Sequence, residues 1–359
     1  MELLHNHWRG QPVRVISNDR LLRAARGESV DATPVWFMRQ AGRSLPEYRA
    51  VRGIGSILDV IKQPELAAEI TMQPVRRYGV DGAVLYSDIV VPAHAIGFGV
   101  DIAPGVGPVI ANPIRSASDL SRLRPYEPEV DAPYVSHAIR SLVAELDVPL
   151  IGFAGAPFTV ASYLVEGRPS RTYEHTKSLM YGNENLWHSL MDRLADMAIA
   201  SLLSQVAAGA SAIQLFDSWV GVFSARDYTR YVMPHSAKVL GAMAASGVPR
   251  IHFGVGTGEL LTLMGEAGAD VVGVDWRVPL DVASQRVGPH RALQGNLDPV
   301  VVTCDWSVVE AHTREVVRLG ATHSGGHIFN LGHGVTPDLD PEVLTRIVAL
   351  VHDPVGFVA

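Results

Sequence analysis

The stretch YGVDGAVLYSD, residues 78–88, runs from a glycine suited to ending a helix, through a short turn, into an apolar strand with an acid at its end. Two later stretches repeat this layout, AGASAIQLFDS at 208–218 and AGADVVGVDW at 267–276. A helix that ends just before a buried strand is the repeating unit of parallel α/β folds. The repetition therefore predicts a sheet of parallel strands.

Short apolar runs recur along the whole chain, and their hydrophobicity is continuous rather than alternating. This pattern is typical of strands that are covered on both faces. The runs lie at 34–38, 82–88, 149–155, 212–218, 250–256, 271–276, 292–298 and 327–334. Between them, 131–146 and 185–210 carry apolar residues at helical spacing, and Asp131 is the expected N-cap of the first.

Eight strands alternating with helices predict a (β/α)8 TIM barrel, with residues 1–359 as a single domain. Extra elements are expected in the long segment 99–113 after the second strand. The competing fold is a doubly wound open sheet, which should have a glycine-rich turn after its first strand. The chain has RQAGRSLPEYR there, at 39–49, and its nearest glycine pattern follows the fifth strand at 254–260. The pattern favours the barrel.

The composition limits the partners. The chain is 47% hydrophobic, with a net charge of −7 and no basic block, so nucleic-acid binding is not expected. Its single cysteine, Cys304, excludes an intrachain disulfide and a cysteine-rich zinc site. The N-terminus lacks the layout of a signal peptide, and no apolar run reaches membrane-spanning length. We expect a cytoplasmic protein with no membrane partner.

Polar residues follow the predicted strands at the end where barrel enzymes carry their chemistry. Taken singly, each has a structural explanation, such as a helix cap or a core aromatic. Their common location indicates a binding site. They are Arg39, Arg43, Asp88, Tyr163, Asp217, Ser218, His252, Asp275, Asn296, Asp298, Asn330 and His333.

Arg39 and Arg43 end the first strand, in PVWFMRQAGR at 34–43. A guanidinium near a core needs an anionic partner, and its planar fork suits carboxylates and phosphates. If the arginines have a structural role, the partner would be Glu47 or an aspartate. If they have a functional role, the partner would be an anionic ligand.

Histidine spacing raises the question of a metal site. His323 and His327 form a His-x3-His pattern that is followed by His333, and His252 is a further candidate ligand. His323 and His327 lie at the start of the eighth strand, whereas His333 lies at its end, so the three are not expected to bind one metal. No metal site is predicted.

Several motifs resemble those of a known family. PVWFMRQAGRSLPEYR at 34–49 and GFAGAPFTVASYLVEG at 152–167 resemble the two signatures of the uroporphyrinogen decarboxylase family. YSDI at 86–89, LFDSWVG at 215–221 and NLGHGVTPDLDPE at 330–342 fall where that family has its active-site strand ends. The resemblance extends from about Asn18 to Val351.

The resemblance implies a (β/α)8 barrel, a homodimer and a carboxy-lyase of heme biosynthesis. The reaction implied is removal of CO2 from the four acetate side chains of uroporphyrinogen III to give coproporphyrinogen III, without cofactor or metal. The family's catalytic residues fall on Asp88, Tyr163, His333 and Arg39. Its substrate-binding residues fall on Arg39, Gln40, Arg43, Asp88, Tyr163, Phe216, Ser218 and His333.

These residue types suit that chemistry. An ionised carboxylate only accepts hydrogen bonds, so Asp88 could hold the pyrrole N–H groups at the centre of a reduced macrocycle. Protonation of a pyrrole carbon would supply the electron sink for decarboxylation. Tyr163 and His333 are easier proton donors than Arg39, because a guanidinium rarely loses its proton. The sequence leaves the donor open.

Two other functions remain open. A related zinc-dependent methyltransferase would need thiolate ligands, and Cys304 stands alone. A tetrapyrrole carrier without turnover would not require Asp88, Tyr163 and His333 together.

Overall fold

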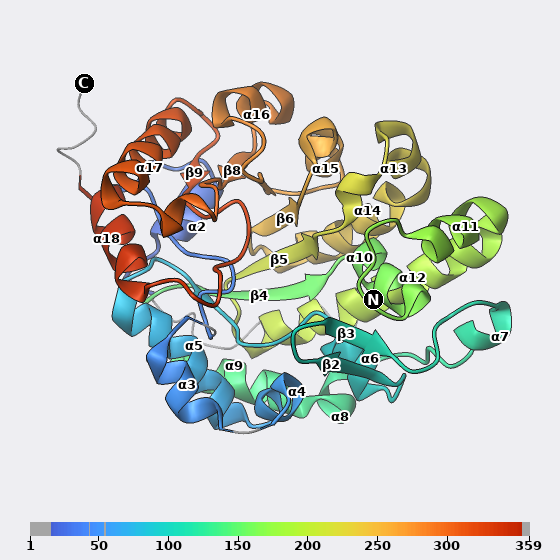
Figure 1. Cartoon of the computed structure of the whole chain (residues 1–359). Coiled ribbons are helices and arrows are strands. Elements are labelled where there is room, and N and C mark those ends of the chain that lie inside the picture. Colours follow the sequence, from blue (N-terminus) through green and yellow to red (C-terminus); the bar gives the residue numbers. More distant parts are fainter. Residues whose placement is uncertain (1–15, 43, 54, 354–359) are drawn as a thin grey trace.

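Seven parallel strands form one curled sheet at the centre of the molecule, with helices around it (Figure 1). The computed structural model describes residues 16–42, 44–53 and 55–353. The sheet order is β1 (Ala83–Val84), β4 (Leu150–Gly155), β5 (Ala212–Asp217), β6 (Arg250–Gly254), β7 (Val271–Gly273), β8 (Ala292–Gln294) and β9 (His327–Ile328). All seven coincide with runs predicted from the sequence.

The first predicted strand, 34–38, closes the barrel without forming a regular strand. Val35 makes an isolated parallel bridge to Phe329, beyond the end of β9. On its other side, the Val35 carbonyl accepts a hydrogen bond of 2.7 Å from the Asp81 N–H, just before β1. Because this segment joins both edges of the sheet, the sheet has no free edge there, and the predicted (β/α)8 barrel is confirmed over the open doubly wound sheet.

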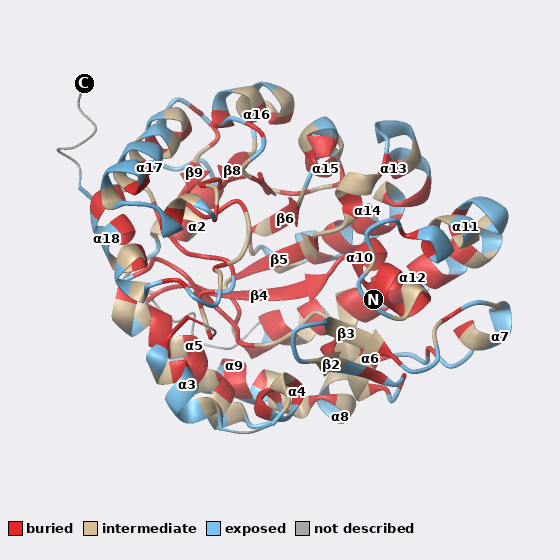
Figure 2. Ribbon diagram, in the orientation of Figure 1, coloured by how far each residue is buried: buried red, intermediate tan, exposed pale blue. Residues whose placement is uncertain are grey.

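The helices form the outer ring, and their outward faces are exposed while the strands are buried (Figure 2). α18 packs against both α17 and α5, which closes the ring. The α-helices are α2 (Arg20–Ala25), α3 (Pro46–Arg52), α4 (Ile57–Ile61), α5 (Pro64–Tyr78), α6 (Val91–Ala95), α7 (Ala117–Leu120), α8 (Pro128–Asp131), α9 (Pro133–Glu145), α10 (Pro157–Glu166), α11 (Glu174–Gly182), α12 (Glu184–Ala208), α13 (Ala225–Tyr231), α14 (Met233–Met243), α15 (Leu261–Glu266), α16 (Leu280–Val287), α17 (Trp306–Ala321) and α18 (Pro341–Val351). Short 3-10 turns are η1 (Val220–Val222), η2 (Ala244–Ser246), η3 (Gly258–Leu260) and η4 (Val301–Thr303).

Two local predictions can be compared with these bounds. The extra elements expected in 99–113 are an antiparallel hairpin of β2 (Val100–Ala103) and β3 (Gly107–Ile110). The prediction of Asp131 as an N-cap is wrong, because Asp131 ends α8 and Ala132 precedes α9. The Asp131 carboxylate instead accepts hydrogen bonds from the Glu127 N–H and the Arg124 guanidinium.

The barrel interior contains polar side chains that join strands from different sides. Trp36 Nε1 donates to Gln294 Oε1 over 3.0 Å, and Gln294 Nε2 donates to Gln214 Oε1 over 2.9 Å. All three residues are fully or almost fully buried, and they come from the closing segment, β8 and β5. Such bonds compensate polar groups in a dry interior and fix the relative position of the strands that carry them.

The barrel wall opens beside β4, because β1 is so short. The Phe153 N–H and C=O are bonded by the side-chain amide of Gln205 from α12, at 2.8 Å each, rather than by a neighbouring strand. A side chain thus takes the place of a strand at this point, and the chain after β1 is free to diverge. The divergent residues, Ser87 to Ile89, include the predicted site residue Asp88.

Candidate active site

Asp88 lies in the opening between β1 and β4 and is partly exposed. Its Oδ1 accepts a hydrogen bond of 3.0 Å from the Val90 N–H, which orients the carboxylate before α6. Asp88 also lines a hollow of about 20 Å³ together with Phe153, Ser201 and Gln205. That hollow has room for about one water molecule. The hollow itself is therefore too small for a larger ligand.

Arg39 lies in the loop that leaves the closing segment, and its side chain is exposed. Its φ of 61° is a left-handed backbone conformation, which is uncommon for a residue with a side chain. The stem of Arg39 packs against Gly334, where an added Cβ would lie 2.5 Å from Arg39 Cδ. The loop after β9 is therefore shaped to admit this arginine. Arg43 lies outside the described residues.

Tyr163 on α10 is within reach of the charges of both Asp88 and Arg39. Burial raises the pKa of its hydroxyl, and the negative charge of Asp88 raises that pKa further. Trp219 and the positive charge of Arg39 act in the opposite direction. Because the pKa of Tyr163 is raised overall, its hydroxyl stays protonated at neutral pH and is a hydrogen-bond donor.

An aromatic ladder forms one wall of the mouth. Phe216 at the end of β5 meets Phe153 of β4 with ring centroids 5.4 Å apart, and Phe253 of β6 at 6.1 Å. Phe216 is half-buried, and Ser218 follows it at the start of the loop after β5. The wall is suited to the apolar faces of a flat or domed ring.

Two further predicted residues, Gln40 and His333, form hydrogen bonds with the backbone. The Gln40 side chain is fully buried, accepting from the Phe37 N–H at 2.9 Å and donating to the Gly82 carbonyl at 3.0 Å. His333 Nδ1 accepts a hydrogen bond of 2.7 Å from the Gly334 N–H. Because Nδ1 is an acceptor, neutral His333 carries its proton on Nε2, which can donate to a ligand.

The sequence missed one polar cluster behind these residues. Thr159 Oγ1 donates to Asp217 Oδ1 over 3.0 Å and accepts from the Trp219 N–H over 3.4 Å. Thr159 lies one helical turn before Tyr163 on α10, and the Tyr163 and Trp219 rings are 6.3 Å apart. The cluster thus joins α10 to the loop after β5. The sequence feature that could have indicated this cluster is the four-residue spacing of Thr159 and Tyr163 within the second signature, which puts the two side chains on the same face of a helix.

His252 was expected at the rim, but it lies within β6 and is fully buried beside Asp217. The other histidines do not form a cluster with His333. His323 Nδ1 bonds Ser284, and His327 Nε2 bonds the Gly295 carbonyl. Among the described residues no group of three or more His, Cys, Asp or Glu side chains could hold a metal ion.

Four predicted rim residues remain. Asn330 is fully buried and accepts a hydrogen bond of 3.0 Å from the Met38 N–H. Asp275 and Asn296 shape the loop after β7. Asp275 is almost fully buried and accepts from the Gly256 N–H at 2.5 Å and from Arg277 Nη1 at 2.6 Å. Asn296 donates to the Asp275 and Val278 carbonyls at 2.9 and 2.6 Å. Asp298 Oδ1 accepts from the Val300 N–H at 2.9 Å, which fits a turn role.

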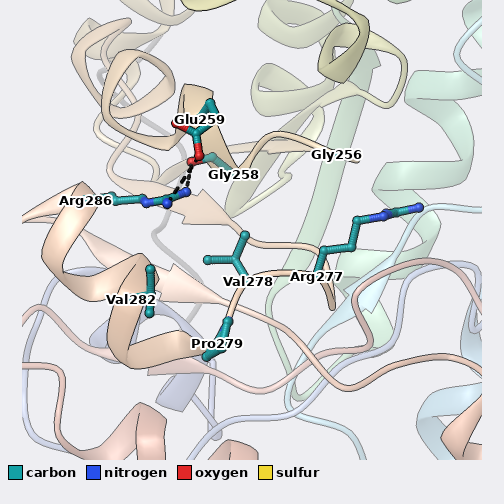
Figure 3. Close-up of a pocket in the computed structure, with 8 residues that line it drawn as sticks. All are labelled: Gly256, Gly258, Glu259, Arg277, Val278, Pro279, Val282 and Arg286. Atoms are coloured by element: carbon teal, nitrogen blue, oxygen red, sulfur yellow. Dashed lines mark hydrogen bonds and ion pairs between the residues drawn. The ribbon is translucent and has the colours of Figure 1, made fainter.

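A hollow of about 350 Å³ lies on the rim between the loops after β6 and β7 (Figure 3). Gly256, Gly258 and Glu259 line it on one side, and Val278, Pro279, Val282, Arg277 and Arg286 line the rest. Arg286 is held by the Gly258 carbonyl at 2.5 Å and by Glu259 at 3.3 Å. The hollow shares none of its lining residues with the small hollow at Asp88.

Within the described residues, no helix combines the length and the hydrophobicity that crossing a membrane requires.

Similar folds occur in solved structures of other activities. A methyltransferase from Methanosarcina mazei matches with a TM-score of 0.75 at 20% identity, over 92% of this chain and 97% of its own. A B12-independent methionine synthase from a Shewanella species matches with a TM-score of 0.55 at 13% identity, over 82% and 87%. At such identities the likeness concerns the fold alone.

Closer relatives are found by sequence. The uroporphyrinogen decarboxylase of Streptomyces griseus is 64% identical over 92% of this chain and 91% of its own length. That of Salinispora tropica is 61% identical over 92% and 89%. The family model described as Uroporphyrinogen decarboxylase (URO-D) matches residues 16–354. The chain therefore belongs to the uroporphyrinogen decarboxylase family.

Proposed function

We propose that this protein converts uroporphyrinogen III to coproporphyrinogen III by removing CO2 from four acetate side chains, with Asp88 holding the centre of the macrocycle. The observation that supports this assignment of roles is that Arg39, Asp88 and Tyr163 follow three different strand segments at the same end of the barrel. The charges of Asp88 and Arg39 shift the pKa of the Tyr163 hydroxyl in opposite directions, which is consistent with a shared site. The phenylalanine ladder with Phe216 supplies an apolar wall for the ring.

Asp88 suits the centre of a porphyrinogen. The reduced macrocycle presents four pyrrole N–H donors, and a carboxylate has about four lone-pair sites and no proton to offer. Protonation of a pyrrole carbon creates a positively charged ring that can take up the electrons left when the neighbouring acetate loses CO2. The charge of Asp88 stabilises that ring electrostatically. This route uses no cofactor and no metal.

Arg39 and Arg43 suit the periphery of the substrate, which carries eight carboxylates. A guanidinium binds a carboxylate through two parallel hydrogen bonds, which fixes direction as well as distance. Packing of Gly334 against the Arg39 stem supports a defined arginine position at the mouth. Gln40 contributes by holding Phe37 and Gly82, the backbone from which Arg39 and Asp88 extend.

Tyr163 and His333 are the two candidate proton donors. The raised pKa of Tyr163 keeps its hydroxyl protonated at neutral pH, which suits hydrogen bonding better than rapid proton release. His333 can donate through Nε2 while Nδ1 is bonded to the Gly334 N–H. We assign proton delivery to His333 and orientation of a substrate carboxylate to Tyr163. Ser218, at the start of the loop after β5, contributes a further hydroxyl at the mouth.

The whole chain, 1–359, acts as a single barrel domain in this proposal. The protein works in the cytoplasm as a homodimer, as the family resemblance implies. The lack of a membrane-spanning helix among the described residues is compatible with that location.

The deciding experiment is anaerobic incubation with uroporphyrinogen III, with products separated by their number of carboxylates. The wild-type protein should give coproporphyrinogen III, and Asp88→Asn should lose about 100-fold or more in kcat/KM because a neutral amide cannot stabilise the protonated ring. Asp101→Asn, on the exposed face of β2, is the matched control and should keep wild-type activity. Near-normal turnover by Asp88→Asn would overturn the role of Asp88.

The same assay separates the carrier function from catalysis. A carrier would bind coproporphyrinogen and release no CO2 from uroporphyrinogen. A methyltransferase would contain stoichiometric zinc in a metal analysis of the purified protein and would also release no CO2.

A further inference from the structure

Basic side chains are distributed unevenly around the barrel mouth. The loops after β5 to β9, each taken up to the next helix or 3-10 turn, span 218–219, 255–257, 274–279, 295–300 and 329–340, and all of their residues are described. Arg277 is the only lysine or arginine in these loops, while four aspartates lie in them: Asp275, Asp298, Asp338 and Asp340. A polycarboxylate at the mouth would therefore meet a single arginine from these five loops.

Arg277 lies across the barrel from Asp88. In the closed sheet, β7 is four places from β1 in either direction, by way of β6, β5 and β4 or by way of β8, β9 and the segment at Val35. Asp88 follows β1 and Arg277 follows β7, so the two residues extend from opposite walls at the same end of the barrel. Arg39 follows the segment at Val35, next to β1, and so belongs to the Asp88 side.

The Arg277 guanidinium is held by two contacts. Its Nη1 donates to Asp275 Oδ2 over 2.6 Å, and its carbon lies over the Trp276 ring, 4.0 Å from the centroid. The backbone N–H of Arg277 donates to Asp275 Oδ1 over 3.0 Å, which fixes the same residue to the same carboxylate. Asn296 in turn bonds the Asp275 and Val278 carbonyls on either side. The arginine is therefore positioned before any ligand arrives, which lowers the entropy cost of binding.

The guanidinium has donors left for a ligand. About half of the Arg277 side chain is exposed (51%), whereas its partner Asp275 is buried. Figure 3 shows Arg277 pointing away from Arg286 and Val282, whereas Arg286 points toward Gly258 and Glu259. One nitrogen of the Arg277 guanidinium, Nη1, is bonded to Asp275, and a guanidinium has five N–H donors, so a second carboxylate can bind the remaining N–H groups.

We propose that Arg277 is a substrate-binding residue that takes a carboxylate on the edge of the macrocycle opposite to Arg39. The substrate carries carboxylates around its whole perimeter, so a ring centred on Asp88 presents some of them to the far wall. Arg277 is the only lysine or arginine of the loops on that wall and is already oriented. This inference rests on the proposed decarboxylase function and extends its binding site across the mouth.

The test compares the wild-type protein with Arg277→Gln and Arg277→Lys in the anaerobic assay. Gln can still donate to Asp275 but has no charge, so KM for uroporphyrinogen III should rise about tenfold or more while kcat stays close to wild type. Loss of one charge should also reduce the decline of kcat/KM with added salt. Arg277→Lys should restore the salt dependence but only part of the affinity, because it lacks the fork.

The matched control is Arg318→Gln, which removes an exposed, ion-paired arginine from α17 on the outer ring. It should change neither KM nor the salt dependence. Unchanged KM and salt dependence in Arg277→Gln, with a wild-type melting temperature, would overturn the inference. If the wild-type protein releases no CO2, the proposed function fails instead, so the two failures are distinguishable.

Discussion

His252 Nε2 lies 3.5 Å from Asp217 Oδ2, and both side chains are fully buried in the barrel wall. The other Asp217 oxygen accepts the Thr159 hydroxyl. A buried carboxylate and its partners depend on one another, because removal of one leaves the others without compensation in a dry interior. The pair therefore holds β5, β6 and α10 together behind the mouth.

Replacement of Asp217 tests this cluster. Asp217→Ala should lower the free energy of unfolding by about 3 kcal/mol, because it leaves the Thr159 hydroxyl buried without its acceptor and removes the carboxylate that lies beside His252. Asp217→Asn keeps an oxygen for Thr159 and should cost less. Urea denaturation measures both. The control is Asp196→Asn, an exposed partner of Lys238, which should change stability by less than about 1 kcal/mol. Equal effects of the Asp217 and Asp196 variants would contradict the assigned role.

His327 should make the protein sensitive to mild acid. Burial lowers the pKa of His327 to about 4, so the folded protein binds its proton less readily than the unfolded chain, where the pKa is about 6.5. The stability contribution is complete above about pH 6.5 and is lost as the pH falls toward about 4. The full loss amounts to about 3 kcal/mol.

The measurement is the melting temperature between about pH 4 and 6.5 for wild type and His327→Gln. Gln can still donate to the Gly295 carbonyl, but it does not titrate, so its melting temperature should fall less over this range. His312→Gln, at an exposed position of α17, should follow the wild-type curve. Parallel curves for wild type and His327→Gln would exclude His327 as the titrating group.

Gly334 should be intolerant of a side chain, because its neighbour is Arg39. In Gly334→Ala the added Cβ would lie 2.5 Å from Arg39 Cδ and 2.7 Å from Cγ, so the arginine has to move. We expect a higher KM for uroporphyrinogen III and accumulation of partly decarboxylated products, with a stability loss of about 1–3 kcal/mol at most.

Gly241→Ala is the matched control, because nothing lies within 4 Å of a Cβ built there on α14. It should leave KM unchanged and raise stability by up to about 1 kcal/mol. Wild-type KM and products in Gly334→Ala would show that Arg39 does not depend on this contact.

The sequence was sufficient for features that depend on local pattern. Continuous apolar runs located all seven strands of the sheet, and helical spacing located α12 at Glu184–Ala208. The same patterns made Asp88 and Tyr163 candidate site residues, because barrel enzymes use the C-terminal ends of strands. Each of these inferences needs only neighbouring residues.

Tertiary structure decided the features that depend on residues far apart in the chain. The segment at Val35 looked like a full strand but makes only one bridge, since its pairing depends on where Phe329 and Asp81 lie. His252 was expected at the rim, but the length of β6 and the position of Asp217 bury it. No sequence pattern indicated a role for Arg277, and only closure of the barrel sets it opposite Asp88. The periodicity of a segment indicates which of its residues are buried. The residues that it packs against are decided by the fold of the whole barrel.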